Sequence, residues 1–523
     1  LVREHTLSSD ERPPTDRLHT ALRAMHDTIS ISDGRLAAFT IVHEPDSDRT
    51  WLYLIAHHLI VDVVSWQILT SDIERAYQIL QAGQRLPDGT SPGMPSHEPD
   101  REPRRGRGGE PVPDQHWQDL AAAVKPRLPG TRSAVASTSA TAATTAATPA
   151  AGRVSVHRHL SARAGTYLRH DVPRLHGIGA HAVLLAALQR ALSPHSDGPG
   201  LYVWLEGHGR TRPGTAGIEH AVGWLTVLYP ALFTTVDAQP ARLVDLAAGI
   251  HRQLAAVPDS GAGFGETVFR HPDSPLARLL TASGLPQVTF SYLGQQPPAH
   301  RLLLPAAGPH SATIGAGNVL PTPFDVTVAP AQDGTVTCQF SVDPALLARG
   351  DVQQAADRFA AEVETAARLV PLTTAPANDS ARALFLIHPV GGLIDWYTPL
   401  ATALGPGWDC YGLPHDHSGH DTTMNSLARR YLTRIRAAIP AGPYTLAGWC
   451  MGAPLAYEII RQAQADGDDD RIDDLILMDP TRAEQPQNPR DALIAHVQFA
   501  IPHQTKPAVV DALDATGHLA IPD

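Results

Sequence analysis

Three sets of residues in this chain of 523 residues have side chains that could carry out chemistry. His57 and His58 are adjacent, and Asp62 follows four residues after the second histidine. Glu206 is a further candidate, and so is Cys450, which stands in the sequence Gly-Trp-Cys-Met-Gly. Histidine and glutamate suit general acid–base catalysis, and a cysteine thiolate is a nucleophile. These residue types would allow proton transfer at one site and acyl transfer at another.

Spacing alone leaves other interpretations open. The two histidines come where a strand gives way to a loop, so one imidazole could face a channel while Asp62 braces the loop. The same spacing also suits a buried polar turn or a pair of metal ligands. Cys450, for its part, could be an inert buried cysteine.

Apolar patterning indicates the elements that would position these residues. A strand at 51–56 precedes the histidines, and an amphipathic helix follows them to about Leu80. A second folded region opens near Arg153. It continues through helices and strands at 180–192, 201–205, 288–292, 335–342 and 352–369.

Beyond a Pro-containing linker, strands alternate with helices, which predicts a parallel sheet. The strands are expected at 384–387, 444–447 and 475–478, and the helices at 397–404 and 451–463. Cys450 then stands at a sharp strand-to-helix turn, the nucleophile elbow of an α/β hydrolase with cysteine in the serine position. Its glycines permit the turn, and the start of the following helix favours a thiolate.

We expect four segments along the chain. Two stretches of the first segment are rich in Pro, Gly, Arg and Glu or in Ala, Thr and Ser, so they cannot bury enough apolar surface and should be mobile. The segments are a first lobe at 1–150 with mobile stretches at 87–115 and 130–152, a second lobe at 151–369, a linker at 370–382 and a final domain at 383–523.

Composition limits the function classes. The chain is 43% hydrophobic and 18% charged, as is ordinary for a soluble globular protein. Its net charge of -12 argues against nucleic acid or an anionic membrane as a partner. Three cysteines and no long apolar run predict a cytoplasmic protein without a disulfide framework or membrane span. The first residues read neither as a signal peptide nor as a natural start, so a piece of a longer chain is expected.

Four motifs in order resemble the condensation superfamily of nonribosomal peptide synthetases, in its epimerisation branch. The run from His57 to Asp62 is similar to HHxxxD, and 205–210 is similar to the EGHGR block. Residues 222–230 and 290–295 are similar to the VGWFTxxYP and FNYLGQ blocks. The resemblance implies an α/β fold of two chloramphenicol-acetyltransferase-like lobes with the active site between them.

In that family the reaction inverts the α-carbon of a carrier-bound aminoacyl or peptidyl thioester. The resemblance places the acid–base roles on His58 and Glu206, with Asp62 holding the loop and Tyr292 bordering the enolate. His57 is expected to be scaffold. Val63 departs from the usual Gly and Ser291 from the usual Asn, which leaves the activity open. Only 56 residues precede the double histidine, so we expect an incomplete first lobe.

The last domain resembles the type I thioesterases of peptide synthetases. That resemblance implies Cys450 as nucleophile, Asp479 as the triad aspartate and oxyanion amides from Val390 and Met451. The triad histidine should lie beyond a helical lid. The histidines that follow Asp479 fall where the lid would be, and none is assigned as catalytic: His496, His503 and His518. The domain is therefore expected to be C-terminally truncated.

The two resemblances together imply a terminal synthetase segment that epimerises a peptidyl thioester and then releases the peptide by hydrolysis or cyclisation. No cofactor is expected to bind directly, because the substrate would arrive on the phosphopantetheine arm of an upstream carrier domain. One rival function is an inactive condensation-like module that recruits a tailoring partner such as a cytochrome P450. Another is peptide-bond formation, which the EGHGR-like block disfavours.

Overall fold

The computed structural model describes fifteen stretches of the chain. They are residues 2–6, 25–44, 49–86, 115–128, 152–210, 220–234, 242–265, 268, 272–294, 322–331, 333–372, 381–415, 423–439, 442–468 and 471–478. Nearly all of the two stretches expected to be mobile, 87–115 and 130–152, lies outside the described residues.

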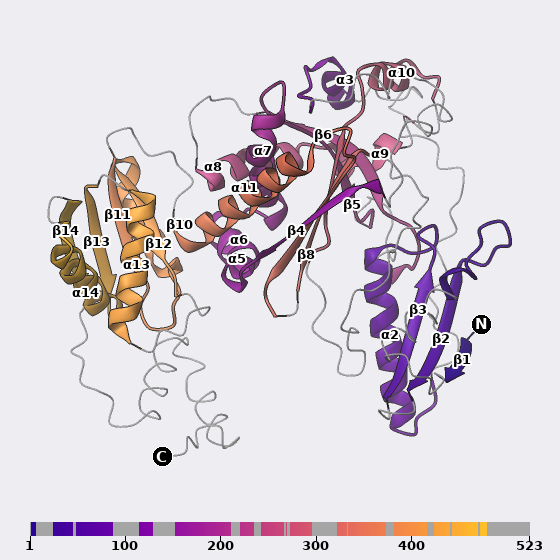
Figure 1. Cartoon of the computed structure of the whole chain (residues 1–523), viewed down its shortest axis with the longest axis horizontal. Coiled ribbons are helices and arrows are strands. Elements are labelled where there is room, and N and C mark those ends of the chain that lie inside the picture. The colour runs from indigo at the N-terminus through magenta and orange to yellow at the C-terminus, as the bar shows by residue number, and fades with distance from the viewer. Residues whose placement is uncertain are drawn as a thin grey trace, which may run out of the picture.

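The N-terminal lobe is a small sheet with one long helix beside it (Figure 1). Strand β1 (Val2–Thr6) runs parallel to β2 (Ala37–Glu44), and β2 is antiparallel to β3 (Arg49–Ala56). Helix α2 (Val63–Gln81) follows β3 after a short loop, as the sequence predicted. The double histidine stands in that loop, between the end of the strand and the start of the helix.

The second lobe is built on a mixed six-stranded sheet with the order β4-β9-β8-β7-β5-β6. Strands β8 and β9 alternate buried with mostly half-buried residues, whereas the first five residues of β5 are all buried. The bounds are β4 (Val154–Leu160), β5 (Leu201–Gly207), β6 (Val227–Phe233), β7 (Val288–Tyr292), β8 (Phe324–Pro330) and β9 (Val336–Val342).

Helix α7 (Ala180–Leu192) forms the centre of the helical layer, between α8 (Leu243–Ala255) and α11 (Arg349–Arg368). It is apolar around nearly its whole circumference and almost fully buried, as a helix in the middle of a core must be. The chain enters this layer through α5 (Ala162–Thr166), a π-helical turn at Tyr167–Asp171 and α6 (Val172–His176). The remaining helices are α9 (Ala262–Gly265) and α10 (Pro275–Ala282).

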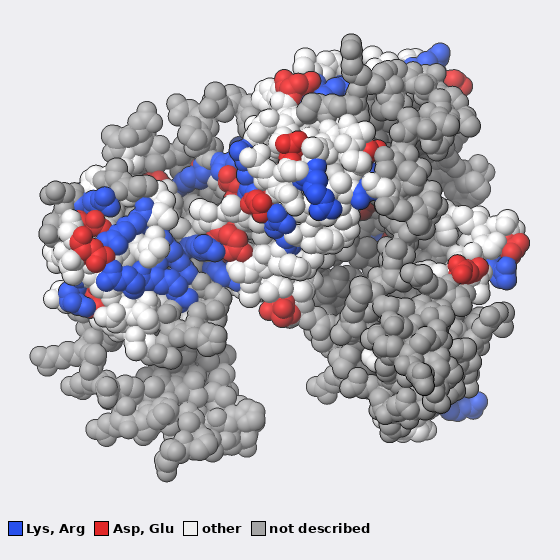
Figure 2. Space-filling view, viewed as in Figure 1, with Lys and Arg blue, Asp and Glu red and all other residues white. Residues whose placement is uncertain are grey.

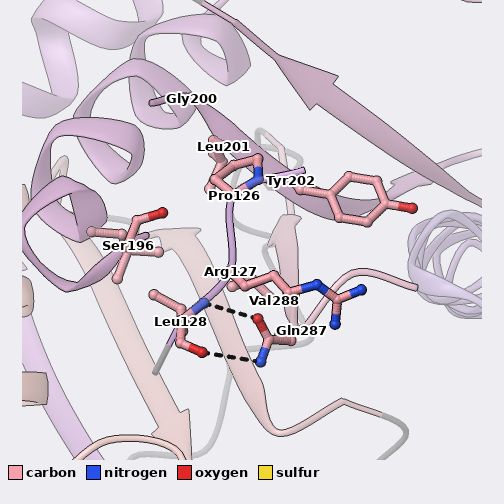
Figure 3. A pocket seen from close by; sticks show the side chains of 10 residues that line it. Pro126, Arg127, Leu128, Ser196, Gly200, Leu201, Tyr202, Gln287 and Val288 are labelled. Carbon is pink, nitrogen blue, oxygen red and sulfur yellow. Dashed lines mark hydrogen bonds between the residues drawn. The ribbon is translucent and has the colours of Figure 1, made fainter. Parts of the chain in front are cut away.

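One segment assigned to the first lobe belongs to the second lobe instead. Helix α3 (Gln115–Ala122) buries Trp117 against Phe264, with ring centroids 5.0 Å apart. Figure 3 shows the following turn, where the Leu128 N–H donates to the Gln287 side chain at 2.9 Å. The assignment of 1–150 to one lobe was therefore wrong for residues 115–128, because an isolated short amphipathic helix gives no sign of which core it joins.

The C-terminal domain is a five-stranded sheet with the order β10-β12-β11-β13-β14. All neighbours are parallel except β10 and β12, so the alternation predicted a parallel sheet correctly. The bounds are β10 (Val370–Pro371), β11 (Arg382–Ile387), β12 (Trp408–Leu413), β13 (Tyr444–Trp449), β14 (Ile472–Met478), α12 (Thr398–Leu404), α13 (Met424–Ala438) and α14 (Gly452–Ala465).

Alternate residues of β11 face two different cores. Phe385 and Ile387 pack with α13 and α14, whereas Leu384 and Leu386 join the apolar cluster that continues into the second lobe. Figure 2 shows arginine side chains gathered over this domain with acidic side chains among them, and Arg436 pairs with Asp468 at 2.6 Å there.

The predicted linker 370–382 begins as part of this sheet. Val370 and Leu372 are fully buried, and Val370 pairs with Gly412 of β12. These residues were assigned to a polar connection, but their apolar side chains serve as the edge strand of the C-terminal sheet.

No helix in the described residues is long and apolar enough to cross a bilayer.

Candidate functional site

The two histidines of the β3–α2 loop point in different directions. The ring of His57 turns back into its own loop, where Nδ1 accepts the Leu59 N–H at 3.1 Å. His58 is exposed, and its ring centroid lies 5.8 Å from that of Trp224 in the second lobe. Because Trp224 comes three residues before β6, the structure places His58 at the junction of the two lobes. His57 is held by its loop, and His58 is the one available to a substrate.

Asp62 is buried at the start of α2 and ties the two lobes together. Its carboxylate caps the helix by accepting the Ser65 N–H at 2.8 Å. It also accepts two hydrogen bonds from Arg210 at 2.8 and 2.9 Å, a bidentate pair that is 2–4% exposed. Burial opposes ionisation of Asp62, but the hydrogen bonds from Arg210 and Ser65 outweigh it and hold its pKa below the usual range.

This ion pair was not foreseen from the sequence, although both partners stand in the quoted motifs. Arg210 ends the EGHGR-like block, and Asp62 ends the HHxxxD-like run, 148 positions away. Ser65 strengthens the junction, since its hydroxyl donates to the Gly223 carbonyl at 2.9 Å. Two separate motifs therefore meet in one buried polar contact between the lobes.

Glu206 is exposed near the end of β5, where its carboxylate accepts a hydrogen bond from the Ser291 hydroxyl at 3.1 Å. Ser291 stands on the neighbouring parallel strand β7, where the family pattern has Asn. Tyr292 follows it and is half-buried, and burial raises the pKa of its phenol while the charge of Arg169 opposes that shift. Glu206 and Ser291 thus lie side by side at the carboxyl ends of two neighbouring strands of the second lobe. His58 lies at the junction between that lobe and the N-terminal lobe.

The departure at Val63 carries no backbone strain. A β-branched residue would be costly there if the position needed a positive φ. Val63 is instead the first residue of α2. Across the described stretches, positive φ occurs at only three residues other than glycine, namely Asp259, Ser260 and Cys450.

Cys450 occupies a sharp turn between β13 and α14. Its φ is +56°, a left-handed conformation that L side chains rarely adopt, and its N–H donates to the Met478 carbonyl at 3.1 Å. The side chain is half-buried. This strand–turn–helix is the nucleophile-elbow geometry that the G-x-C-x-G pattern predicts.

The two glycines of the pattern are required by close backbone contacts. A Cβ at Gly448 would lie 2.0 Å from the Gly452 carbonyl oxygen. A Cβ at Gly452 would lie 2.5 Å from the Ile387 carbonyl oxygen, at the end of β11. The start of α14 therefore presses against the loop after β11, so Met451 and Val390 lie at the same edge of the sheet. That edge is formed by the carboxyl ends of the parallel strands, where α/β proteins bind ligands.

Tyr397 joins the loop to the elbow and was not singled out from the sequence. Its hydroxyl donates to the Ile387 carbonyl at 2.7 Å and accepts the Trp449 N–H at 2.9 Å. Burial raises its pKa to about 12, so the hydroxyl stays protonated at neutral pH.

His388 is fully buried, with Nδ1 bonded to the Pro389 carbonyl and Nε2 to the Tyr431 hydroxyl, both at 2.8 Å.

The rest of the proposed triad lies outside the described residues. Strand β14 ends at Met478, which pairs with Trp449, and Asp479 is the next residue in the chain. The three histidines of the expected lid also fall outside: His496, His503 and His518. No group of three or more His, Cys, Asp or Glu side chains in the described ranges is arranged to hold a metal ion.

Comparison with known proteins identifies two families along the chain. Residues 3–372 match the condensation domain and residues 382–519 match the thioesterase domain. A linear gramicidin synthase of Brevibacillus parabrevis is 32% identical over 248 residues, which are 47% of this chain and 4% of that protein. N-(5-amino-5-carboxypentanoyl)-L-cysteinyl-D-valine synthase of Amycolatopsis lactamdurans is 27% identical over 485 residues, 87% of this chain and 12% of that protein.

Among solved structures, the epimerization domain from the third module of tyrocidine synthetase B is similar with a TM-score of 0.52 and 19% identity. The match covers 69% of this chain and 78% of that domain, and at this identity it shows the fold alone. The chain spans about an eighth or less of the length of the two synthetases named above. The chain belongs to the condensation-domain family of nonribosomal peptide synthetases, and a thioesterase domain of the α/β-hydrolase class follows its condensation fold.

Proposed function

We propose that the condensation fold of this chain epimerises the α-carbon of a peptidyl or aminoacyl thioester. The observation that carries the proposal is that His58 of one lobe lies beside Trp224 of the other lobe, whose strand β5 bears Glu206, and that the buried Asp62–Arg210 pair joins the two lobes. His58 and Glu206 are both exposed, whereas Asp62 and Arg210, which join the lobes, are buried.

The chemistry requires two groups on opposite faces of one carbon. One takes the α-proton, which leaves an enolate conjugated with the thioester carbonyl, and the other returns a proton to the opposite face. Histidine and glutamate both serve such transfers near neutral pH. No atom is gained or lost overall, so the reaction needs no oxidant, metal or further reactant. Tyr292, one residue from Ser291, is proposed to border the enolate.

We propose that the thioesterase domain then takes the peptide onto Cys450. The thiolate attacks the thioester carbonyl, the bond to the carrier's sulfur breaks, and a new thioester forms on the cysteine. The amides of Val390 and Met451 would stabilise the oxyanion, and Asp479 would orient a base histidine that remains unassigned. Release follows by attack of water or of an internal nucleophile. The thioester on Cys450 stays activated, which favours ring closure.

The substrate in this proposal arrives on the phosphopantetheine arm of a separate carrier domain, and no cofactor binds the chain itself. We propose a first lobe within residues 1–150 without 115–128, a second lobe of 151–369 together with 115–128, and a thioesterase domain of 383–523 to which 370–372 adds an edge strand. The negative net charge and the three separate cysteines support a cytoplasmic enzyme whose partners are neither nucleic acid nor membrane.

The rival function is recruitment of a cytochrome P450 by an inactive condensation-like module. Such a module has no need for an acid–base pair at its lobe junction. His58 and Glu206 are both present and exposed here, and Ser291 binds the glutamate, which favours catalysis.

Exchange of the substrate α-proton with deuterated solvent tests the proposal. A peptidyl chain loaded on the pantetheine of a carrier domain is incubated with the protein, and deuterium is measured by mass spectrometry. His58→Ala and Glu206→Gln should each slow exchange by a factor on the order of hundreds. His159→Ala, which removes an exposed histidine from β4, serves as the matched control. Exchange no faster than with carrier alone, together with binding of a cytochrome P450, would establish the rival function.

A further inference from the structure

A cavity of about 770 Å³ lies between the condensation fold and the thioesterase domain. Residues 162–175 of the α5–α6 segment form one wall, and residues 391–395 with 414–415 form the other. This volume is within the range of about 300–1,000 Å³ that is usual for small-molecule sites. The space shown in Figure 3, by contrast, is about 20 Å³, large enough for water only.

The thioesterase wall of the cavity belongs to the catalytic edge of that domain. Residues 391–395 follow β11, and residues 414–415 follow β12, so both come from the carboxyl ends of parallel strands. Cys450 follows β13 at the same edge. Gly391 is the residue after Val390, whose amide is the proposed oxyanion donor. A chain attached to Cys450 that passes the oxyanion loop would therefore enter this cavity.

The two walls are fixed to each other by contacts around the cavity. Arg174 of α6 pairs with Asp395 at 2.7 Å across the opening. Arg242, just before α8, pairs with Asp409 of β12 at 2.7 Å, and both side chains are largely buried. The buried strand β10 completes the connection. The condensation fold thus forms one wall of this cavity and is held against the thioesterase domain by these contacts.

Arg169 is the arginine of the α5–α6 wall whose side chain is available to bind a ligand. Arg163 pairs with Asp171, and Arg174 pairs with Asp395. Within the described stretches Arg169 has no carboxylate partner, and the hydrogen bond that it makes there goes to the Gly334 carbonyl at 3.4 Å. A half-buried guanidinium without a counter-ion is poised to donate to a carbonyl or carboxylate oxygen. Burial raises the pKa of Tyr292, and the charge of Arg169 opposes that shift.

We propose that this cavity is the acyl-chain pocket of the thioesterase, with one wall and its anchoring cation, Arg169, supplied by the condensation fold. The occupant is the peptidyl chain carried on Cys450, with a backbone carbonyl or carboxylate oxygen on Arg169. This inference rests on the proposed acyl-Cys450. An extended tetrapeptide spans roughly 13–14 Å, long enough to pass the oxyanion loop, whereas an acetyl group is too short.

Covalent loading of Cys450 with activated thioesters tests the pocket. The protein is mixed with a tetrapeptidyl or an acetyl thiophenol thioester, and the rate of acylation at Cys450 is followed by intact mass and peptide mapping. Arg169→Ala should slow loading of the tetrapeptide about tenfold or more and leave acetyl loading unchanged. Thr166→Trp, which fills the cavity from α5, should have the same selective effect.

Arg190→Ala is the matched control, because Arg190 is a half-buried arginine of α7 that pairs with Glu362 outside the cavity. If neither thioester loads Cys450 in the unaltered protein, the acyl-cysteine proposal fails and the pocket with it. If both load and Arg169→Ala slows them equally or not at all, the pocket proposal alone is overturned. Acetyl-pantetheine is tested in the same way as a third thioester. If Arg169→Ala slows loading from acetyl-pantetheine but not from the tetrapeptidyl thioester, the cavity holds the carrier arm, which also overturns the pocket proposal.

Discussion

The two candidate sites of this chain are built in opposite ways. The Cys450 elbow is formed by one strand, one turn and one helix that are consecutive in the chain, and two glycines make the turn possible. The His58–Glu206 junction is formed by segments about 150 positions apart, and its geometry depends on the buried Asp62–Arg210 pair. One site depends on local backbone shape, and the other depends on how two lobes are held together.

This difference means that damage to one site should spare the other. A change that loosens the lobes should stop proton exchange and leave Cys450 reactive. A change that distorts the elbow should do the reverse. Variants of either kind should therefore separate the two activities.

The largest effect is expected for Cys450→Ala. Without the thiol no acyl-enzyme can form, so covalent loading at this position should be lost completely while α-proton exchange continues at its normal rate. Cys410→Ala, a buried cysteine in β12, is the matched control and should load normally. In an active synthetase, Cys450→Ser should shift products towards the linear acid or stall as an acyl-serine. Persistent loading in Cys450→Ala would show that another residue is the nucleophile.

Asp62→Asn should produce the next largest effect. It leaves the buried Arg210 without its counter-charge, and breaking a buried pair in this way costs about 3–5 kcal/mol. Hydrogen exchange of α2 backbone amides should rise and α-proton exchange should fall, with Cys450 loading unchanged. The exposed pair Arg158–Asp357 gives the control, since Asp357→Asn should change stability by less than about 1 kcal/mol. An unaltered α2 in Asp62→Asn would contradict the role assigned to this pair.

The same pair sets a pH dependence. Because the pKa of Asp62 in the folded protein lies below its unfolded value of about 3.9, the stabilisation is fully present above roughly pH 4. It is lost as the pH falls through the lower folded value. Hydrogen exchange measured from pH 7 down to 3 should therefore show α2 loosening only below about pH 4, and a change between pH 5 and 7 would point to another group.

Gly448→Ala should affect only the elbow. The added methyl group would stand 2.0 Å from a backbone oxygen, so the turn must shift, at a cost of about 1–3 kcal/mol. Loading of Cys450 should fall at least tenfold while α-proton exchange stays unchanged. Gly249→Ala, in the interior of α8 with open space around it, should instead stabilise the protein by about 0.4–1 kcal/mol. Equal loading by both variants would show that the elbow tolerates the shift.

The smallest effect is expected for Ser291→Ala. It removes the hydrogen bond to Glu206 at 3.1 Å but leaves the carboxylate in place. We expect α-proton exchange to slow about threefold to tenfold, in line with the loss of one hydrogen bond to a charged group at an exposed position. Ser291→Asn, which restores the family residue, should recover most of the rate. A loss as large as that of Glu206→Gln would mean that Ser291 itself takes part in the proton transfer.

The sequence predicted most of the regular elements near the sites because their signals are local. Helix 180–192 has the predicted bounds, and the strand before the double histidine and the strand before Cys450 were both found. The elbow followed from its glycines for the same reason. What could not be predicted is pairing over long separations. The docking of Trp117 on Phe264 and the edge pairing of Val370 depend on cores that only the complete fold assembles.

Among the candidate residues, too, those with a local motif could be predicted and those that depend on distant partners could not. The motifs singled out Asp62 and placed Glu206 in a block that also contains Arg210, yet nothing in the chain indicated that the aspartate and the arginine form one pair. Tyr397 was missed because a hydroxyl that bridges two backbone groups leaves no spacing pattern. Asp479 lies outside the described residues, so its role stays a prediction.

Strand β10 has a consequence for recombining synthetases in the laboratory and in evolution. Residues 370–372 lie within the condensation-domain match but supply the buried edge of the sheet of the following domain. A crossover placed between residues 372 and 382 would give the incoming thioesterase a foreign edge strand and would discard the Arg242–Asp409 contact. Exchanges that carry these residues together with the thioesterase, or that transfer the second lobe and the thioesterase as one block, should give hybrids that fold and express better than those joined in the intervening segment.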